Sequence, residues 1–126
     1  MRSVIISAII AVVIVASSIL YTNKLDNISA ELIKINDNIG ESLKKEDFES
    51  ANADIEKMRD YLEKKRSMLD ATGNHTEMDN IEMNIFELLE YSKEEQKADA
   101  LSKNRVLGFL YKHLPVNYKL KWENIL

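Results

Sequence analysis

The sequence contains no cysteine, only one proline and only three glycines among its 126 residues. Without cysteine the chain forms no disulfide, has no thiolate metal site and offers no cysteine nucleophile or lipidated cysteine. One proline and three glycines leave little room for the many turns that a β-rich fold requires. The scarcity of these residues favours long helices joined by few turns.

Charged residues are absent between Arg2 and Lys24, and the run from Val4 to Leu20 is mostly apolar. A helix of about 20 residues spans about 30 Å, the thickness of the hydrocarbon core of a bilayer. The run is too long for a buried strand, since strands average about five or six residues. We therefore predict a transmembrane signal anchor over residues 1–23 and a soluble helical domain over residues 24–126.

The flanks of the apolar run set the expected orientation and leave one alternative open. Residues 16–18 are small (Ala-Ser-Ser), as a signal peptidase requires, so a cleaved signal peptide is the competing interpretation. A short N-terminal tail ahead of a long polar domain is typical of a signal anchor in the cell membrane. We therefore expect a cytoplasmic N-terminus and an extracytoplasmic domain. Ser7 and Ala11 form a small-xxx-small pair that would allow two anchors to meet in a homodimer.

Four segments after the anchor show the apolar periodicity of amphipathic helices. No proline separates the anchor from the first segment, so one helix can carry both. Gly40 and the polar turn 44–47 are expected to end that helix, residues 72–74 to separate the second from the third, and Pro115 to end the fourth. The apolar positions are Leu25, Ile28, Leu32, Ile35 and Ile39; Phe48, Ala51, Ile55, Met58, Leu62 and Leu69; Met78, Ile81, Ile85, Leu88 and Leu89; and Ala98, Leu101, Val106, Leu107, Leu110, Tyr111 and Leu114.

Short connections between these segments imply antiparallel neighbours. The expected fold is all-α: one N-terminal transmembrane helix followed by about four amphipathic helices in antiparallel hairpins. The stretch from Lys45 to Ala51 resembles the entry into the second helix of tetratricopeptide-like hairpins, with an echo about 49 residues later, where Ala100 corresponds to Ala51. Two imperfect copies predict hairpin geometry in a helical bundle, not a solenoid.

One cluster of residues could bind a metal. His75, Asp79 and Glu82 lie near the start of the third segment, and an antiparallel fourth segment would bring His113 back toward them. Imidazole and carboxylate groups are ligands for zinc or another divalent ion. The alternative is structural, with His75 and His113 tying the ends of the hairpin together. The sequence has no phosphate loop and no nucleophile elbow, so we expect no enzyme activity and no cofactor.

Charge is distributed unevenly over the second half of the chain. Residues 77–99 hold eight acidic and two basic residues, whereas residues 102–122 hold five basic and no acidic ones. The basic segment, with aromatic residues that include Tyr118 and Trp122, could bind anionic lipid or a wall polymer. Alternatively, its acidic neighbour neutralises it and the tail forms a short helix that closes the core. The whole chain carries a net charge of −4, which argues against nucleic-acid binding.

Several short motifs together resemble a small bacterial family of unknown function that occurs in spore-forming Gram-positive bacteria. They are the anchor from Val4 to Leu20, Lys45-Glu46-Asp47-Phe48 followed by Ala51, His75-x-Glu77-Met78-Asp79, Lys112-His113-Leu114-Pro115, and Asn124-Ile125-Leu126. Phe48 and Tyr61 stand where this family tends to have tryptophan. The resemblance implies an N-terminal membrane helix with an all-helical remainder, and it supplies no reaction, substrate or cofactor.

These observations predict a non-enzymatic, membrane-anchored, extracytoplasmic interaction module of the bacterial envelope. Its partner would be another envelope membrane protein, and residues 4–20 would contact membrane lipid. We expect the interaction surfaces at Leu32, on the first stripe, and around Tyr118 and Trp122 in the tail. The alternative functions are a metal- or ligand-responsive sensory domain that uses His75, Asp79 and His113, and binding of anionic lipid or wall polymer through the basic tail.

Overall fold

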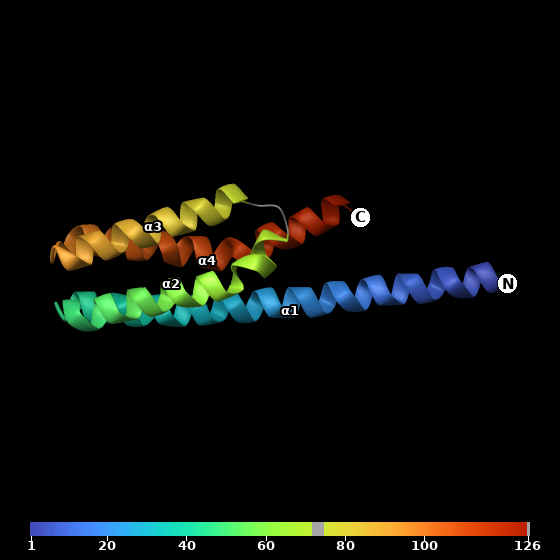
Figure 1. Cartoon of the computed structure of the whole chain (residues 1–126), viewed down its shortest axis with the longest axis horizontal. Coiled ribbons are helices and arrows are strands. Elements are labelled where there is room, and N and C mark those ends of the chain that lie inside the picture. Colours follow the sequence, from blue (N-terminus) through green and yellow to red (C-terminus); the bar gives the residue numbers. More distant parts are fainter. Residues whose placement is uncertain (72–74, 126) are drawn as a thin grey trace.

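The computed structural model describes the backbone of residues 1–71 and 75–125, and the side chains within these ranges as far as Leu114. These residues form four α-helices and no strand: α1 (Arg2–Lys44), α2 (Phe48–Asp70), α3 (His75–Lys93) and α4 (Lys97–Ile125). Successive helices run antiparallel, and each packs mainly against two neighbours, in the order α1, α2, α3, α4 and back to α1 (Figure 1). The predicted all-α bundle of helical hairpins is confirmed.

Helix α1 carries the apolar run and the first core stripe without a break over its 43 residues. No residue of α1 before Leu25 is buried, and the buried stripe begins there. Figure 1 shows the N-terminal half of α1 extending alone beyond the other helices. This one N-terminal helix is long and apolar enough to span a membrane.

The two hairpins, α1 with α2 and α3 with α4, close through matching turns. Glu46 and Glu95 have positive φ angles of 59° and 56°. After α1, the amide of Glu46 donates to the carbonyl of Leu43 and the amide of Asp47 to that of Ser42. The equivalent bonds recur 49 residues later, at Glu95 and Gln96. These bonds satisfy the last carbonyls of each helix in the Schellman arrangement, which gives both hairpins the same geometry.

Gly40 lies inside α1, contrary to the expectation that it ends the helix. A Cβ at this position would come 2.8 Å from Oδ1 of Asn104 on α4, so the absence of a side chain allows the two helices to approach. Asn36, one turn earlier, donates to the carbonyl of Asn104 at 2.8 Å, and the Asn104 amide donates back to the carbonyl and Oδ1 of Asn36 at 2.8 and 2.9 Å. This reciprocal pair sets the register between α1 and α4.

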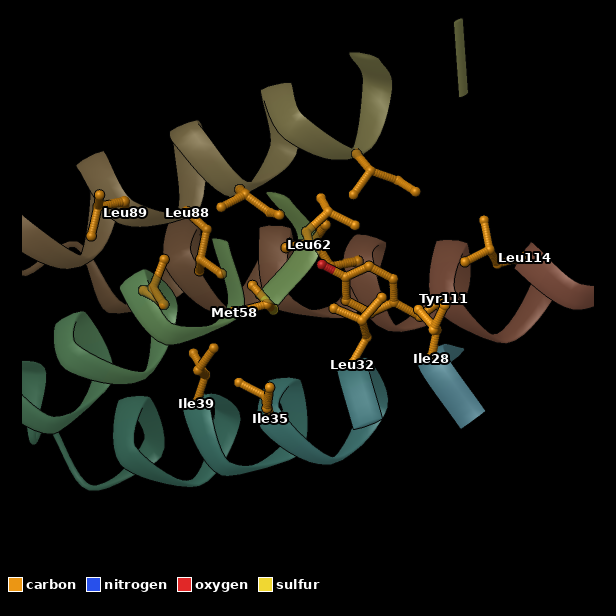
Figure 2. Close-up of a cluster of buried hydrophobic side chains, with 14 of the residues drawn as sticks. Ile28, Leu32, Ile35, Ile39, Met58, Leu62, Leu88, Leu89, Tyr111 and Leu114 are labelled. Carbon is orange, nitrogen blue, oxygen red and sulfur yellow. The ribbon is translucent and has the colours of Figure 1, made fainter. Parts of the chain in front are cut away.

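The core runs along the axis of the bundle and contains apolar side chains from all four helices. In Figure 2, Ile28 and Leu32 of α1, Leu62 of α2 and Leu88 of α3 point into the same interior as Tyr111 of α4. Tyr111 and Leu32 are fully buried. Removal of such side chains from water, at about 25 cal/mol per Å² of apolar surface, is the main force holding the four helices together.

The fourth helix continues through Pro115 to Ile125, whereas the sequence predicted that Pro115 would end it. A proline has no backbone N–H, so position 115 cannot donate to the carbonyl of Tyr111 four residues earlier. The hydroxyl of Ser29 on α1 donates to this carbonyl instead, at 2.6 Å. A side chain from a neighbouring helix therefore supplies the bond that the proline removes, and α4 continues.

Candidate functional site

A groove of about 210 Å³ lies between α2 and α3 and is the best candidate for a binding site. Its walls combine apolar side chains with charged groups. Of the apolar lining residues, Leu62, Ile85 and Leu89 are almost wholly buried and Phe86 is exposed, so an apolar group of a partner would contact mainly Phe86 while the charged residues orient it. The lining residues are Arg59, Leu62, Glu63, Glu82, Ile85, Phe86 and Leu89.

Phe86 is the most unusual residue of this groove. Ile85 and Leu89 belong to the core stripe of α3, whereas Phe86 is turned about 100° from Ile85 and is 63% exposed. Met83, one turn earlier on α3, is 59% exposed. Two large exposed apolar side chains one turn apart form a small apolar patch beside the groove, which makes this face a candidate contact surface.

Arg66 connects α2 to α3 beside the groove. Its Nε lies 3.3 Å from Oδ2 of Asp70, and one terminal nitrogen lies 3.4 Å from Oδ1 of Asp79. The other terminal nitrogen pairs with Glu82, and this hydrogen bond is the main reason that the pKa of Arg66 is raised above its ordinary value. The guanidinium thus contacts three carboxylates, and its ion pairs link the C-terminal end of α2 to the N-terminal part of α3.

The predicted metal ligands are not brought together by this arrangement. Nδ1 of His75 lies 3.6 Å from Oδ1 of Asp70, and Asp79 contacts Arg66. His113 stacks on Phe109, with ring centroids 4.2 Å apart, and its Nδ1 lies 2.8 Å from the Phe109 carbonyl. In the described ranges no group of three His, Asp or Glu side chains could hold a metal ion. The metal hypothesis therefore gains no geometric support and stays a prediction.

The predicted interaction residues fall into two groups. Leu32 has none of its surface exposed, because the stripe from Leu25 to Ile39 forms one side of the bundle's own core. The prediction of a partner surface at Leu32 is therefore corrected, and the residue has a structural role. Tyr118 and Trp122 lie on the C-terminal part of α4, where their side chains are outside the described residues.

The basic segment of α4 is only partly neutralised by the acidic α3. Nζ of Lys103 lies 2.6 Å from Oε2 of Glu87, and this hydrogen bond raises the pKa of Lys103. Arg105 and Lys112 are exposed, and neither forms an ion pair with any residue that the structure describes. Of the three basic residues whose side chains the structure describes, neutralisation therefore accounts for Lys103 but not for Arg105 or Lys112.

The side chain of Tyr111 places an unpaired polar group in the core. Its hydroxyl has no hydrogen-bond partner among the described residues, and burial raises its pKa above the ordinary value. We expect Tyr111→Phe to increase the free energy of unfolding by about 1 kcal/mol, because the variant no longer desolvates an unpaired hydroxyl. Denaturant titration of the full chain in micelles, followed by circular dichroism, measures this change. Tyr61→Phe is the matched control, and an equal gain in both variants would contradict the interpretation.

Sequence reasoning missed the groove although part of its signal was visible. Met83 and Phe86 are large apolar residues that do not fit the stripe of the third segment, and such outliers on an amphipathic helix can mark an exposed patch. The contacts of Arg66 gave no comparable signal. They depend on the packing of α2 against α3, and residue spacing alone does not define that packing.

The sequence model of one protein family matches residues 19–125, which include the whole bundle. The description of that family is Domain of unknown function (DUF4363). No curated protein and no solved structure matches the chain.

Proposed function

Because the chain belongs to the DUF4363 family, whose domain has no assigned function, we propose a role for it from its structure. The protein is a non-enzymatic, single-pass membrane protein of the bacterial envelope, and its helical bundle binds another protein of the same membrane through the groove between α2 and α3. The N-terminus is cytoplasmic and the bundle extracytoplasmic. Labelling from outside the cell, described below, tests this orientation.

The observation that carries this proposal is the continuity of α1. One helix contains the exposed apolar run and then one side of the bundle, with no loop between them. A bundle tied to the membrane in this way cannot reorient freely, because tilting it would require bending or breaking the helix. The continuous helix therefore keeps the groove at a nearly constant height above the membrane, within reach of neighbouring membrane proteins.

The position of the groove supports a partner in the same membrane. The hydroxyl of Tyr21, just after the apolar run, donates to the carbonyl of Met68 at 3.2 Å, so the end of α2 lies level with the membrane boundary. Leu62 lines the groove six residues before Met68, or about 9 Å farther from the membrane at about 1.5 Å per residue. A short extramembrane helix or loop of a membrane protein reaches this height.

The absence of cysteine allows one experiment to test both orientation and partner. Phe86→Cys is expressed in cells and treated from outside with a membrane-impermeant maleimide that carries a photo-crosslinker. We expect labelling of intact cells and, after illumination, crosslinking to one discrete membrane protein. Phe109→Cys is the matched control, since Phe109 is 62% exposed but lies on α4. It should label equally well without forming this product.

The other outcomes of this experiment are equally informative. Labelling of both variants only after lysis would place the bundle in the cytoplasm and overturn the orientation. A crosslink between two copies of the chain at residue 86 would replace the heterologous partner with a homodimer. The same product from Phe86→Cys and Phe109→Cys would show that contact is not confined to the groove, and the docking site would be wrong.

A further inference from the structure

The register between α1 and α4 determines how far α4 extends toward the membrane. Ser29 contacts Tyr111, and Asn36 contacts Asn104, so each residue toward the N-terminus of α1 is matched by one residue toward the C-terminus of α4. Eight residues before Ser29 is Tyr21, at the boundary of the apolar run, and eight residues after Tyr111 is position 119. The helix α4 ends at Ile125, so its last turns reach the level of the apolar run.

Figure 1 is consistent with this extrapolation. The C-terminal turns of α4 and the N-terminal half of α1 leave the bundle at the same end, beyond α2 and α3, and diverge from each other. If α1 spans a membrane, the C-terminal turns of α4 reach the level of its surface. Because they diverge from α1 (Figure 1), we place them along the headgroup region and not beside α1 in the hydrocarbon core.

The sequence of these turns suits that location. Positions 118–122 read Tyr-Lys-Leu-Lys-Trp, and residues 116–125 as a whole hold two lysines and one acidic residue, Glu123. Tyrosine and tryptophan are enriched at membrane–water interfaces, and lysine side chains extend their ammonium groups to the headgroups. A basic segment beside an anionic surface gains about 1 kcal/mol for each lysine or arginine.

We propose that the C-terminal turns of α4, residues 116–125, are a second membrane contact that binds anionic phospholipid headgroups through Lys119 and Lys121. With α1 they hold the bundle at two points on the bilayer surface, which fixes its rotation about α1 as well as its height. This inference rests on the proposed anchoring by α1. The alternative is a tail that closes the open end of the core.

Trp122 makes the proposal directly measurable, because it is the only tryptophan of the chain. The full chain is reconstituted in vesicles of phosphatidylcholine, alone or mixed with phosphatidylglycerol, and recovered by flotation. We expect brominated phosphatidylcholine to quench the tryptophan emission and iodide in the water to have little effect. Quenching by the brominated lipid should increase with phosphatidylglycerol content and decrease as salt screens the headgroup charges.

Two pairs of substitutions test the role of charge. The double variant Lys119→Gln/Lys121→Gln should weaken the docking equilibrium of the tail on anionic vesicles about 30-fold, at about 1 kcal/mol for each lysine. The matched control, Lys93→Gln/Lys97→Gln, removes two lysines beside the turn between α3 and α4, at the far end of the bundle. It should leave the quenching unchanged. Equal quenching in both double variants would overturn the headgroup contact.

Flotation tests the anchor α1 separately from the second membrane contact. If the chain floats with the vesicles but brominated lipid does not quench Trp122, anchoring holds and the second contact is wrong. If neither quencher then lowers the emission of Trp122, the tail is packed on the bundle. If iodide alone lowers it, the tail lies in water. A chain that stays behind when the vesicles float would overturn the anchor together with the inference built on it.

Discussion

The variant Asn36→Asp is expected to lower the free energy of unfolding by about 3 kcal/mol or more at neutral pH. Asn36 is 3% exposed, and its Nδ2 donates to the Asn104 carbonyl at 2.8 Å. Aspartate at this position places a carboxylate oxygen against a carbonyl oxygen in a site shielded from water. Burial raises the pKa of a fully buried carboxyl group by up to about 3–5 units. Each pKa unit lowers the stability of the charged folded state by about 1.36 kcal/mol.

The pH dependence of this loss distinguishes buried charge from disturbed packing. The pKa of the introduced carboxyl group is raised in the folded state, so the protonated form is the stable one, and it can donate its proton to the Asn104 carbonyl. The loss of unfolding free energy in Asn36→Asp should be smallest below the pKa of aspartate in the unfolded state, about 3.9. It should grow as the pH rises through the pKa of this carboxyl group in the folded state. Denaturant titrations at several pH values measure this trend.

Asn38→Asp is the matched control for this prediction, because it makes the same chemical change two residues away on the same helix. Asn38 is exposed, and surface substitutions usually change stability by less than about 0.5 kcal/mol. A deficit at Asn36 that is equal at all pH values would indicate that packing, not charge, causes the loss. Equal stability of the two variants would contradict the assignment of the Asn36–Asn104 pair as a structural contact.

The same pair illustrates what the sequence could and could not predict about α1 and α4. Asn36 and Gly40 are spaced four apart, as are Asn104 and Gly108, and a Cβ at Gly108 would lie 3.4 Å from Nδ2 of Asn36. In antiparallel helices these two motifs face each other, with each asparagine beside the other helix's glycine. The four-residue spacing is visible in the sequence. That the two motifs lie opposite each other depends on how α1 and α4 pack. Taken alone, Gly40 predicts a helix end.

The periodic features were predicted best. The first three apolar stripes place all their residues but Phe48 in the core, because burial follows the helical period directly. Of the fourth stripe only Leu107, Tyr111 and Leu114 are buried, whereas Ala98 and Val106 are exposed. Of the first stripe, Leu32 illustrates the limit of this inference, since a stripe on one helix does not reveal whether its own chain or a partner covers it. The groove at Phe86 depends on how α2 packs against α3, and its one visible sign in the sequence is an apolar residue outside the stripe.

Replacing Pro115 by alanine is expected to raise the free energy of unfolding by up to about 3 kcal/mol. Proline in the interior of a helix costs about this much, through the missing N–H and contact with the carbonyl four residues earlier. In this chain the cost is reduced because the Ser29 hydroxyl donates to the carbonyl of Tyr111 at 2.6 Å. The gain in Pro115→Ala should therefore fall below the full value, and denaturant titration in micelles measures it.

A double-mutant cycle tests whether Ser29 compensates for the proline. In the native chain, Ser29→Ala leaves the buried carbonyl of Tyr111 without its donor and should cost about 1–3 kcal/mol. In the Pro115→Ala background, the new amide at position 115 can donate to the same carbonyl, so Ser29→Ala should cost about 1 kcal/mol less. Additive effects would show that the hydroxyl and the missing amide do not act on one carbonyl. A coupling of this size would show that the Ser29 hydroxyl supplies, to the carbonyl of Tyr111, the hydrogen bond that Pro115 cannot donate.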